Sequence, residues 1–159
     1  MITKLTIVCL CMTASTMVGL WNTKRKKSKV LYFDSCVKLT EKLIADISFR
    51  HENLFAILNE YAQTDKTELS RQIAKFGAAP YDRFEPDGKL LKAEEKRLVS
   101  DFFTSLGSSD AETQLYELEN YNKRFYERYS EENEKFKRTG NVGLKLSVLL
   151  GLAIGILIL

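Results

Sequence analysis

Few residues of this chain have the types and spacing that catalysis or metal binding requires. The sequence contains one histidine, His51, which excludes a site with two histidine ligands and places any Ser-His-Asp arrangement at a predicted helix–helix turn. Cys9 and Cys11 are spaced for a soft metal, but no set of histidine and methionine ligands accompanies them. No Gly-x-x-x-x-Gly-Lys phosphate loop occurs. We therefore predict no catalytic, cofactor-binding or metal-binding residues, and a protein that is not an enzyme.

The paired acidic residues have a simpler interpretation than acid–base catalysis. Glu94 and Glu95, like Glu131 and Glu132, lie in mixed-charge stretches with helical spacing, where we expect solvated side chains. The net charge of +3 does not require a nucleic-acid partner, and none is predicted. The three cysteines make no disulfide framework. The function is therefore expected to depend on how the helices are arranged.

The last fifty residues have the pattern of one long helix. Gly107 favours the end of a preceding helix in a left-handed conformation, and Ser109-Asp110-Ala111-Glu112 has the form of a capping box. An amphipathic stripe follows, with Leu118 and Phe125 among its members. From Val142 onward the polar face disappears. The pattern predicts a helix that starts in water and ends in a membrane.

Residues 141–159 are predicted to form a transmembrane anchor. At 1.5 Å per residue they span roughly 28 Å, just enough for a hydrocarbon core. Small residues recur at every fourth position, at Gly143, Ser147, Gly151 and Gly155. This spacing allows another transmembrane helix to approach closely, although glycine is also common in membrane helices without that role.

Residues 1–21 are predicted to form a first, uncleaved anchor. A signal peptide or lipoprotein signal would also be apolar, but cleavage requires a small-x-small exit, whereas this segment leads into Trp21, and Val8 precedes Cys9. Five basic residues follow at Lys24, Arg25, Lys26, Lys27 and Lys29. By the positive-inside rule they place the residues between the anchors in the cytoplasm, with contact to anionic headgroups as a secondary role.

A second set of small residues lies in the first anchor. Cys11, Ser15 and Gly19 also repeat at intervals of four. We hypothesise that these residues pack against the small residues at 143–155 in an antiparallel helix pair.

Residues 22–140 are predicted to form a helical bundle of about five to six helices. Apolar residues have helical spacing over 33–47 and again over 54–61, with a break near Arg50-His51. Asp65 and Glu68 then predict a capping box for a short helix. No sustained alternation typical of a strand occurs, so the fold class is all-α.

The rest of the bundle contains one substantial loop and a fourth helix. Gly77 is expected to end the short helix, and both prolines fall in the loop that follows. The fourth helix is predicted from about residue 90 to residue 106. Glu94 and Glu95 are expected on its exposed face.

The order of these parts resembles the stage III sporulation protein AB family of endospore-forming bacteria. The motif residues that carry the resemblance are Leu106, Gly107, Asp110 and Gln114. The terminal residues 151–159 also fit, and the resemblance is most specific from Leu98 to the C-terminus. The turn at residues 50–53 departs from the family, which often has a glycine and a proline there.

The resemblance implies a fold and a function. The soluble part of the family is similar to the F domain of the type II secretion inner-membrane platform protein, a bundle usually of six helices. The implied role is that of a membrane component of the secretion-like channel complex between mother cell and forespore. The implied partners are a cytosolic ATPase, stage III sporulation protein AA, other sporulation channel membrane proteins and the lipid bilayer. The implied location is the outer forespore membrane, with the bundle in the mother-cell cytoplasm.

Two other functions stay open. One is a general membrane-anchored helical scaffold, a homo-oligomer formed through the small-residue stripe of its transmembrane segments. The other is a membrane-tethered enzyme, whose activity would depend on His51.

Overall fold

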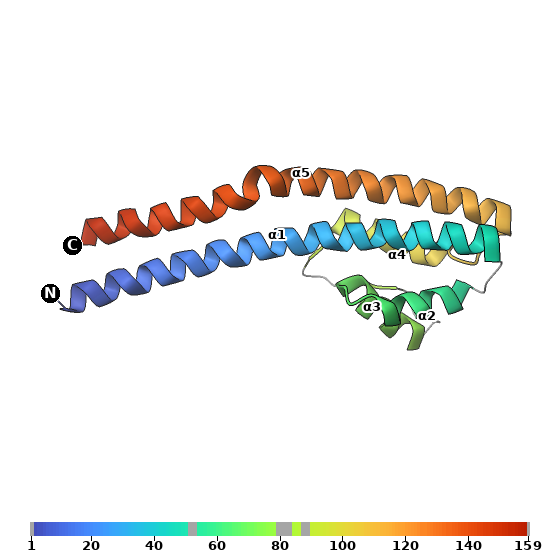
Figure 1. Ribbon diagram of the computed structural model, residues 1–159, viewed down its shortest axis with the longest axis horizontal. Coiled ribbons are helices and arrows are strands. Elements are labelled where there is room, and N and C mark those ends of the chain that lie inside the picture. Colours follow the sequence, from blue (N-terminus) through green and yellow to red (C-terminus); the bar gives the residue numbers. More distant parts are fainter. Residues whose placement is uncertain (1, 51–53, 79–83, 87–89, 159) are drawn as a thin grey trace. The chain divides into compact units, whose positions relative to one another are not determined.

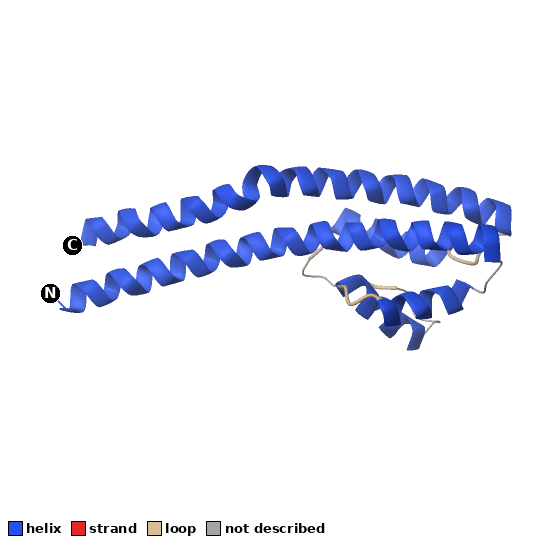
Figure 2. Ribbon diagram, viewed as in Figure 1, coloured by secondary structure: helices blue, strands red, loops and turns tan. Residues whose placement is uncertain are grey.

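The computed structural model describes residues 2–50, 54–78, 84–86 and 90–158. This part of the chain contains no strand and forms five helices (Figures 1 and 2). They are α1 (Ile2–Arg50), α2 (Leu54–Thr64), α3 (Glu68–Ala78), α4 (Ala93–Ser105) and α5 (Ala111–Ile158). The prediction of an all-α helical bundle is confirmed.

The two terminal helices are much longer than the other three. α1 runs without interruption from the predicted anchor into the apolar stripe at 33–47, because residues 20–50 contain neither glycine nor proline. α5 is likewise a single helix, as predicted, and it continues through Gly140, Gly143 and Gly151. The predicted break after Arg50 agrees with the end of α1, and residues 51–53 lie outside the described part.

Packing divides the chain into two compact units. Unit 1 contains Met1–Val30 and Glu131–Leu159, and unit 2 contains Leu31–Ser130. Among the residues that the structure describes, no helix has the length and apolar character needed to cross a bilayer. The two predicted anchors at 1–21 and 141–159, and the boundaries that they set for the bundle at 22–140, are not confirmed and stay predictions.

The core of unit 2 is rich in aromatic side chains. Phe102 of α4 lies edge-on to Tyr121 and Phe125 of α5, with 5.3 Å between ring centroids in each pair. Phe84 stacks on Phe103 at 3.8 Å. Each such pair stabilises the fold by about 0.5–1.5 kcal/mol beyond the free energy gained by burying its apolar area. The remaining helices contribute fully buried residues, which are Tyr32, Phe33, Leu39, Leu43, Ile57, Leu69 and Ile73.

Two polar contacts fix helices within this core. The Asn122 side-chain amide of α5 donates a hydrogen bond to Thr40 Oγ1 of α1 at 2.8 Å. The Tyr61 hydroxyl of α2 donates to the Ser35 carbonyl at 3.0 Å. Burial, with the nearby Asp65 carboxylate, raises the pKa of Tyr61, so its hydroxyl keeps the proton that it donates.

The boundaries of α3 differ from the prediction. The helix begins at Glu68, and its first turn is capped by Thr67, whose hydroxyl accepts the Ser70 N–H at 3.4 Å. Asp65 is one step removed, because it accepts the Thr67 hydroxyl at 3.0 Å. The Asp65 capping box is therefore wrong. Gly77 does not end the helix, which continues to Ala78.

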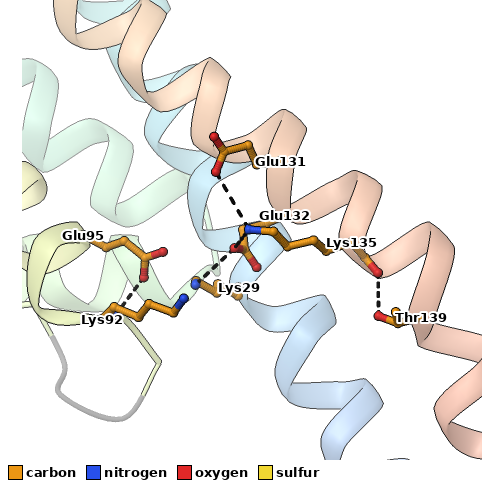
Figure 3. A network of polar contacts seen from close by, with 7 residues as sticks. All are labelled: Lys29, Lys92, Glu95, Glu131, Glu132, Lys135 and Thr139. Carbon is orange, nitrogen blue, oxygen red and sulfur yellow. Dashed lines mark hydrogen bonds and ion pairs between the residues drawn. The ribbon is translucent and has the colours of Figure 1, made fainter.

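α4 begins later than predicted, and Glu95 is buried rather than exposed. Its carboxylate accepts the Lys92 N–H at 2.7 Å (Figure 3). This contact satisfies a backbone donor that would otherwise lack a helical partner at the start of α4. Glu94 is exposed, as predicted.

Candidate functional site

No catalytic constellation was found in the described part of the chain. Its residues include no group of three or more histidine, cysteine or acidic side chains that would hold a metal. His51 and the side chain of Cys11 lie outside the described residues, and Cys9 is exposed. Burial raises the pKa of the Cys36 thiol, which keeps it protonated and unreactive. The candidate functional features of the described residues are therefore the packing of the helices and the chemistry of their surface.

In unit 1 the two helices run side by side in antiparallel directions (Figure 1). The Ser15 hydroxyl of α1 donates a hydrogen bond to the Ser147 carbonyl of α5. A Cβ at Gly151 would lie 3.4 Å from Ser15 Cβ and 3.5 Å from Met12 Cα. A Cβ at Gly151 would thus be in van der Waals contact with α1, and a larger side chain would not fit on this side of α5.

The other predicted packing residues have different surroundings. Gly19 is buried. Gly143 is partly exposed, and a Cβ there would meet no atom within 4 Å. The surroundings of Cys11 and Gly155 lie outside the described residues. The structure therefore brings Ser15, Ser147 and Gly151 together, and their packing within a membrane stays a prediction.

An ion-pair cluster also joins the two helices of unit 1 (Figure 3). Lys29 Nζ of α1 lies 3.4 Å from Glu132 Oε1 of α5, and the two side chains are only 11% and 14% exposed. Lys135 approaches Glu132 at 3.1 Å and Glu131 at 3.8 Å. The cluster joins α1 to α5 through opposite charges.

The pKa of Glu132 reflects two opposing effects. Burial raises the pKa because it disfavours the charged form. The hydrogen bond from Lys135 and the positive charges of Lys29 and Lys135 lower it by more, so the pKa lies below its usual range. Glu132 is therefore ionised at neutral pH.

The five predicted basic residues separate into two groups. Lys29 is buried against Glu132, and Lys26 donates a hydrogen bond to the Thr139 hydroxyl of α5 at 3.1 Å. Lys24, Arg25 and Lys27 are exposed. The first group thus contributes to the pairing of α1 with α5, and the second lies on the surface of unit 1.

Most of the exposed large apolar side chains lie in unit 1. On α1 they are Leu10, Met17, Val18, Leu20 and Trp21. On α5 they are Val142, Leu146, Val148, Leu149, Leu150, Leu152 and Ile154. Exposed apolar side chains in such number are typical of a region that contacts a partner or lipid.

Both helices of unit 1 change from charged to apolar at the same level. On α1 the basic cluster begins at Lys24, and only Lys4 is charged before it. On α5 the charged stretch ends at Arg138, and only Lys145 is charged after it. The hydrogen bond between Lys26 and Thr139 brings these two points together within the pair. If two antiparallel helices cross the same planar boundary between water and lipid, both must change from charged to apolar residues at that boundary.

The four motif residues of the predicted resemblance meet in one turn of unit 2. Gly107 has φ +75°, and its N–H donates to Gln114 Oε1 at 2.8 Å. Asp110 caps α5 by accepting the Thr113 N–H at 3.4 Å. Hydrogen bonds from the Thr113 side chain and backbone hold the pKa of Asp110 below its usual range. Leu106 packs against the core.

This turn corrects the predicted start of α5. The helix begins at Ala111 and is capped by Asp110, not by the Ser109 capping box. The left-handed conformation predicted for Gly107 is confirmed. The motif thus has a structural explanation, because it joins α4 to α5 at a fixed geometry.

A comparison with protein families identifies the C-terminal half. Residues 81–159 match the family stage III sporulation protein AB. The match confirms the predicted resemblance over 79 of the 159 residues, including the motif turn and all of α5. The family implies a role in sporulation. No curated protein and no solved structure matches the chain.

The residues that join the two long helices by polar contacts were not recognised from the sequence. Lys29 was grouped with the surface lysines, and Glu132 with the solvated acids. Neither Lys26 nor Thr139 was assigned a partner. The available signal was the antiparallel order of the two small-residue stripes, which predicts that residues after 19 lie opposite residues before 143.

Proposed function

We propose that this protein is a non-enzymatic membrane component of the sporulation complex between mother cell and forespore. It acts as a platform that couples a cytosolic ATPase to membrane partners. The observation that carries the proposal is the match of residues 81–159 to stage III sporulation protein AB. The location that we propose is the outer forespore membrane, with unit 2 in the mother-cell cytoplasm.

The surface of unit 1 supports the membrane part of the proposal. Its exposed leucine, valine and tryptophan side chains are unfavourable in water. Moving them into lipid would gain about 25 cal/mol of free energy for each Å² of apolar area removed from water. Except for Lys4 and Lys145, its basic residues lie on one side of the apolar surface, which by the positive-inside rule is the cytoplasmic side.

The resemblance to stage III sporulation protein AB implies the ATPase partner. The sequence has no phosphate loop of its own, which agrees with energy supplied by another protein. The test is photo-crosslinking in sporulating cells, with a photo-reactive residue at Arg97 or Tyr126, both exposed on unit 2. We expect recovery of the ATPase, stage III sporulation protein AA. The same residue at exposed Gln63 tests whether recovery depends on the surface chosen.

The outcomes of this experiment separate the proposal from its alternative. Recovery of the ATPase from Arg97 or Tyr126 but not from Gln63 would support the platform role and identify the contact surface. Recovery of this chain alone would favour the oligomeric scaffold. The structure offers that alternative little support, because Ser15, Ser147 and Gly151 already contact one another within one chain.

The platform role includes a mechanical step along α5. This helix is continuous through Thr139–Asn141 and contributes residues to both units, so a rotation or tilt could pass along it. A flexible glycine insertion at 139–141 should abolish sporulation while leaving each unit folded. Normal sporulation with that insertion would refute transmission through a rigid helix.

A further inference from the structure

One surface of α1 combines apolar, aromatic and basic side chains in a fixed order. Met17 and Trp21 are 73% and 74% exposed, and Lys24 and Lys27 follow on the same helix, also exposed. The spacings of four, three and three residues place these side chains on neighbouring positions of one helical surface. We call the last three of them, Trp21, Lys24 and Lys27, the outer basic site.

The outer basic site faces away from α5. The residues of α1 with polar contacts to α5 in the described part of unit 1 include Ser15, Lys26 and Lys29, which occupy the opposite side of the helix. Within the described part of the chain, Lys24 and Lys27 form no ion pair. Their charges are therefore available to a ligand outside this protein.

The chemistry of the site matches one kind of ligand. Two lysines three positions apart offer six N–H donors to phosphate oxygens, and each carries a full positive charge. Trp21 has an apolar ring and a single N–H donor, a combination that favours the boundary between headgroups and acyl chains. The exposed apolar side chains of Met17 and Leu10 continue from Trp21 toward the N-terminus, where an acyl chain would lie.

We propose that Trp21, Lys24 and Lys27 bind the headgroup of an anionic phospholipid. The inference rests on the proposed membrane location and adds a lipid preference to it. A zwitterionic headgroup carries a positive group that offsets its phosphate, whereas an anionic headgroup leaves its negative charge for the two lysines. The lipid is thus held by charge at the level where both helices change from charged to apolar.

Trp21 is the single tryptophan of the chain, so it reports directly on this site. The full-length protein is reconstituted in phosphatidylcholine vesicles that contain a minor fraction of a lipid brominated near its glycerol end. The brominated lipid is phosphatidylglycerol in one sample and phosphatidylcholine in the other. Bromine quenches indole fluorescence at short range, and the ratio of quenching in the two samples measures the lipid preference.

We expect the wild-type protein to prefer the anionic lipid, by about fivefold for each lysine that acts near the headgroups. The double variant Lys24→Gln/Lys27→Gln should lose this preference. The matched control Lys66→Gln/Lys75→Gln removes the same charge from exposed positions of unit 2 and should keep it. Far-UV circular dichroism checks that each variant keeps its helix content.

Three results would overturn the proposal. Equal quenching by both lipids in the wild type would show insertion without a headgroup preference, and the proposed membrane location would survive. A preference that persists in Lys24→Gln/Lys27→Gln would assign it to other residues. Absence of quenching by either lipid would remove Trp21 from the bilayer and refute the membrane location as well.

Discussion

The turn between α4 and α5 gives a sharp prediction for the free energy of unfolding. Gly107 has φ +75°, a conformation that costs an L-residue about 1–2 kcal/mol. The added methyl group would lie 3.6 Å from Leu54 Cδ2, which is an ordinary contact distance. Gly107→Ala should therefore lower the stability of unit 2 by about 1–2 kcal/mol, through backbone strain rather than a steric clash.

The two units have separate spectroscopic reporters, which makes this prediction measurable. All seven tyrosines lie in unit 2, whereas the single tryptophan lies in unit 1. Urea unfolding of the full-length chain in mild detergent, followed by near-UV circular dichroism of the tyrosines, measures the stability of unit 2. The tryptophan fluorescence should be unaffected by Gly107→Ala.

Two glycine variants serve as controls. Gly107→Asn should cost less than Gly107→Ala, because asparagine tolerates the left-handed region better. Gly143→Ala lies in a helix with open space around the new methyl group and should gain about 0.5–1 kcal/mol in unit 1. The reasoning would be refuted if Gly107→Ala had no effect, or if alanine and asparagine at this position had equal effects.

Three further predictions concern the contacts of the two units. Gly151→Leu should destabilise unit 1 by about 1–3 kcal/mol, because a Cβ there would already contact Ser15 and leave no room on that side for the rest of the leucine side chain, whereas Gly143→Leu should not; thermal unfolding followed by tryptophan fluorescence compares them. The depressed pKa of Glu132 stabilises unit 1 above the usual glutamate pKa of about 4.3, and this contribution should disappear as the pH falls through the folded-state pKa. An acid titration of the same fluorescence should show that loss in the wild type and not in Glu132→Gln. Gln114→Leu should cost unit 2 about 1 kcal/mol, since the turn N–H loses its acceptor; an unchanged urea midpoint would contradict this.

The features that could be predicted from the sequence are those that depend on local patterns. The stripe on α1 and the length of α5 follow from residue spacing, and a helix buries such a stripe wherever its partner lies. Gly107 could be predicted because few other residues adopt φ +75° at low cost. The motif around it was recognised by resemblance, and its hydrogen bonds became clear only from the structure.

Other features could not be predicted because two neighbouring residues fit the same local role equally well. Asp65 and Thr67 are both good caps for α3, and Ser109 and Asp110 are both good caps for α5, so tertiary packing decides between them. Glu95 lies among charged residues that suggest a solvated surface. It is buried because its carboxylate caps the backbone of α4.

The pairing of α1 with α5 also determines the order in which the protein can assemble. The hydrogen-bonded residues Ser15 and Ser147 are 132 positions apart. At a synthesis rate of about 5–20 residues per second, the ribosome needs roughly 7–26 s to make the second partner after the first. During this interval the inner side of the nascent first helix has no partner from α5. The pair in unit 1 is complete only after α5 has been made.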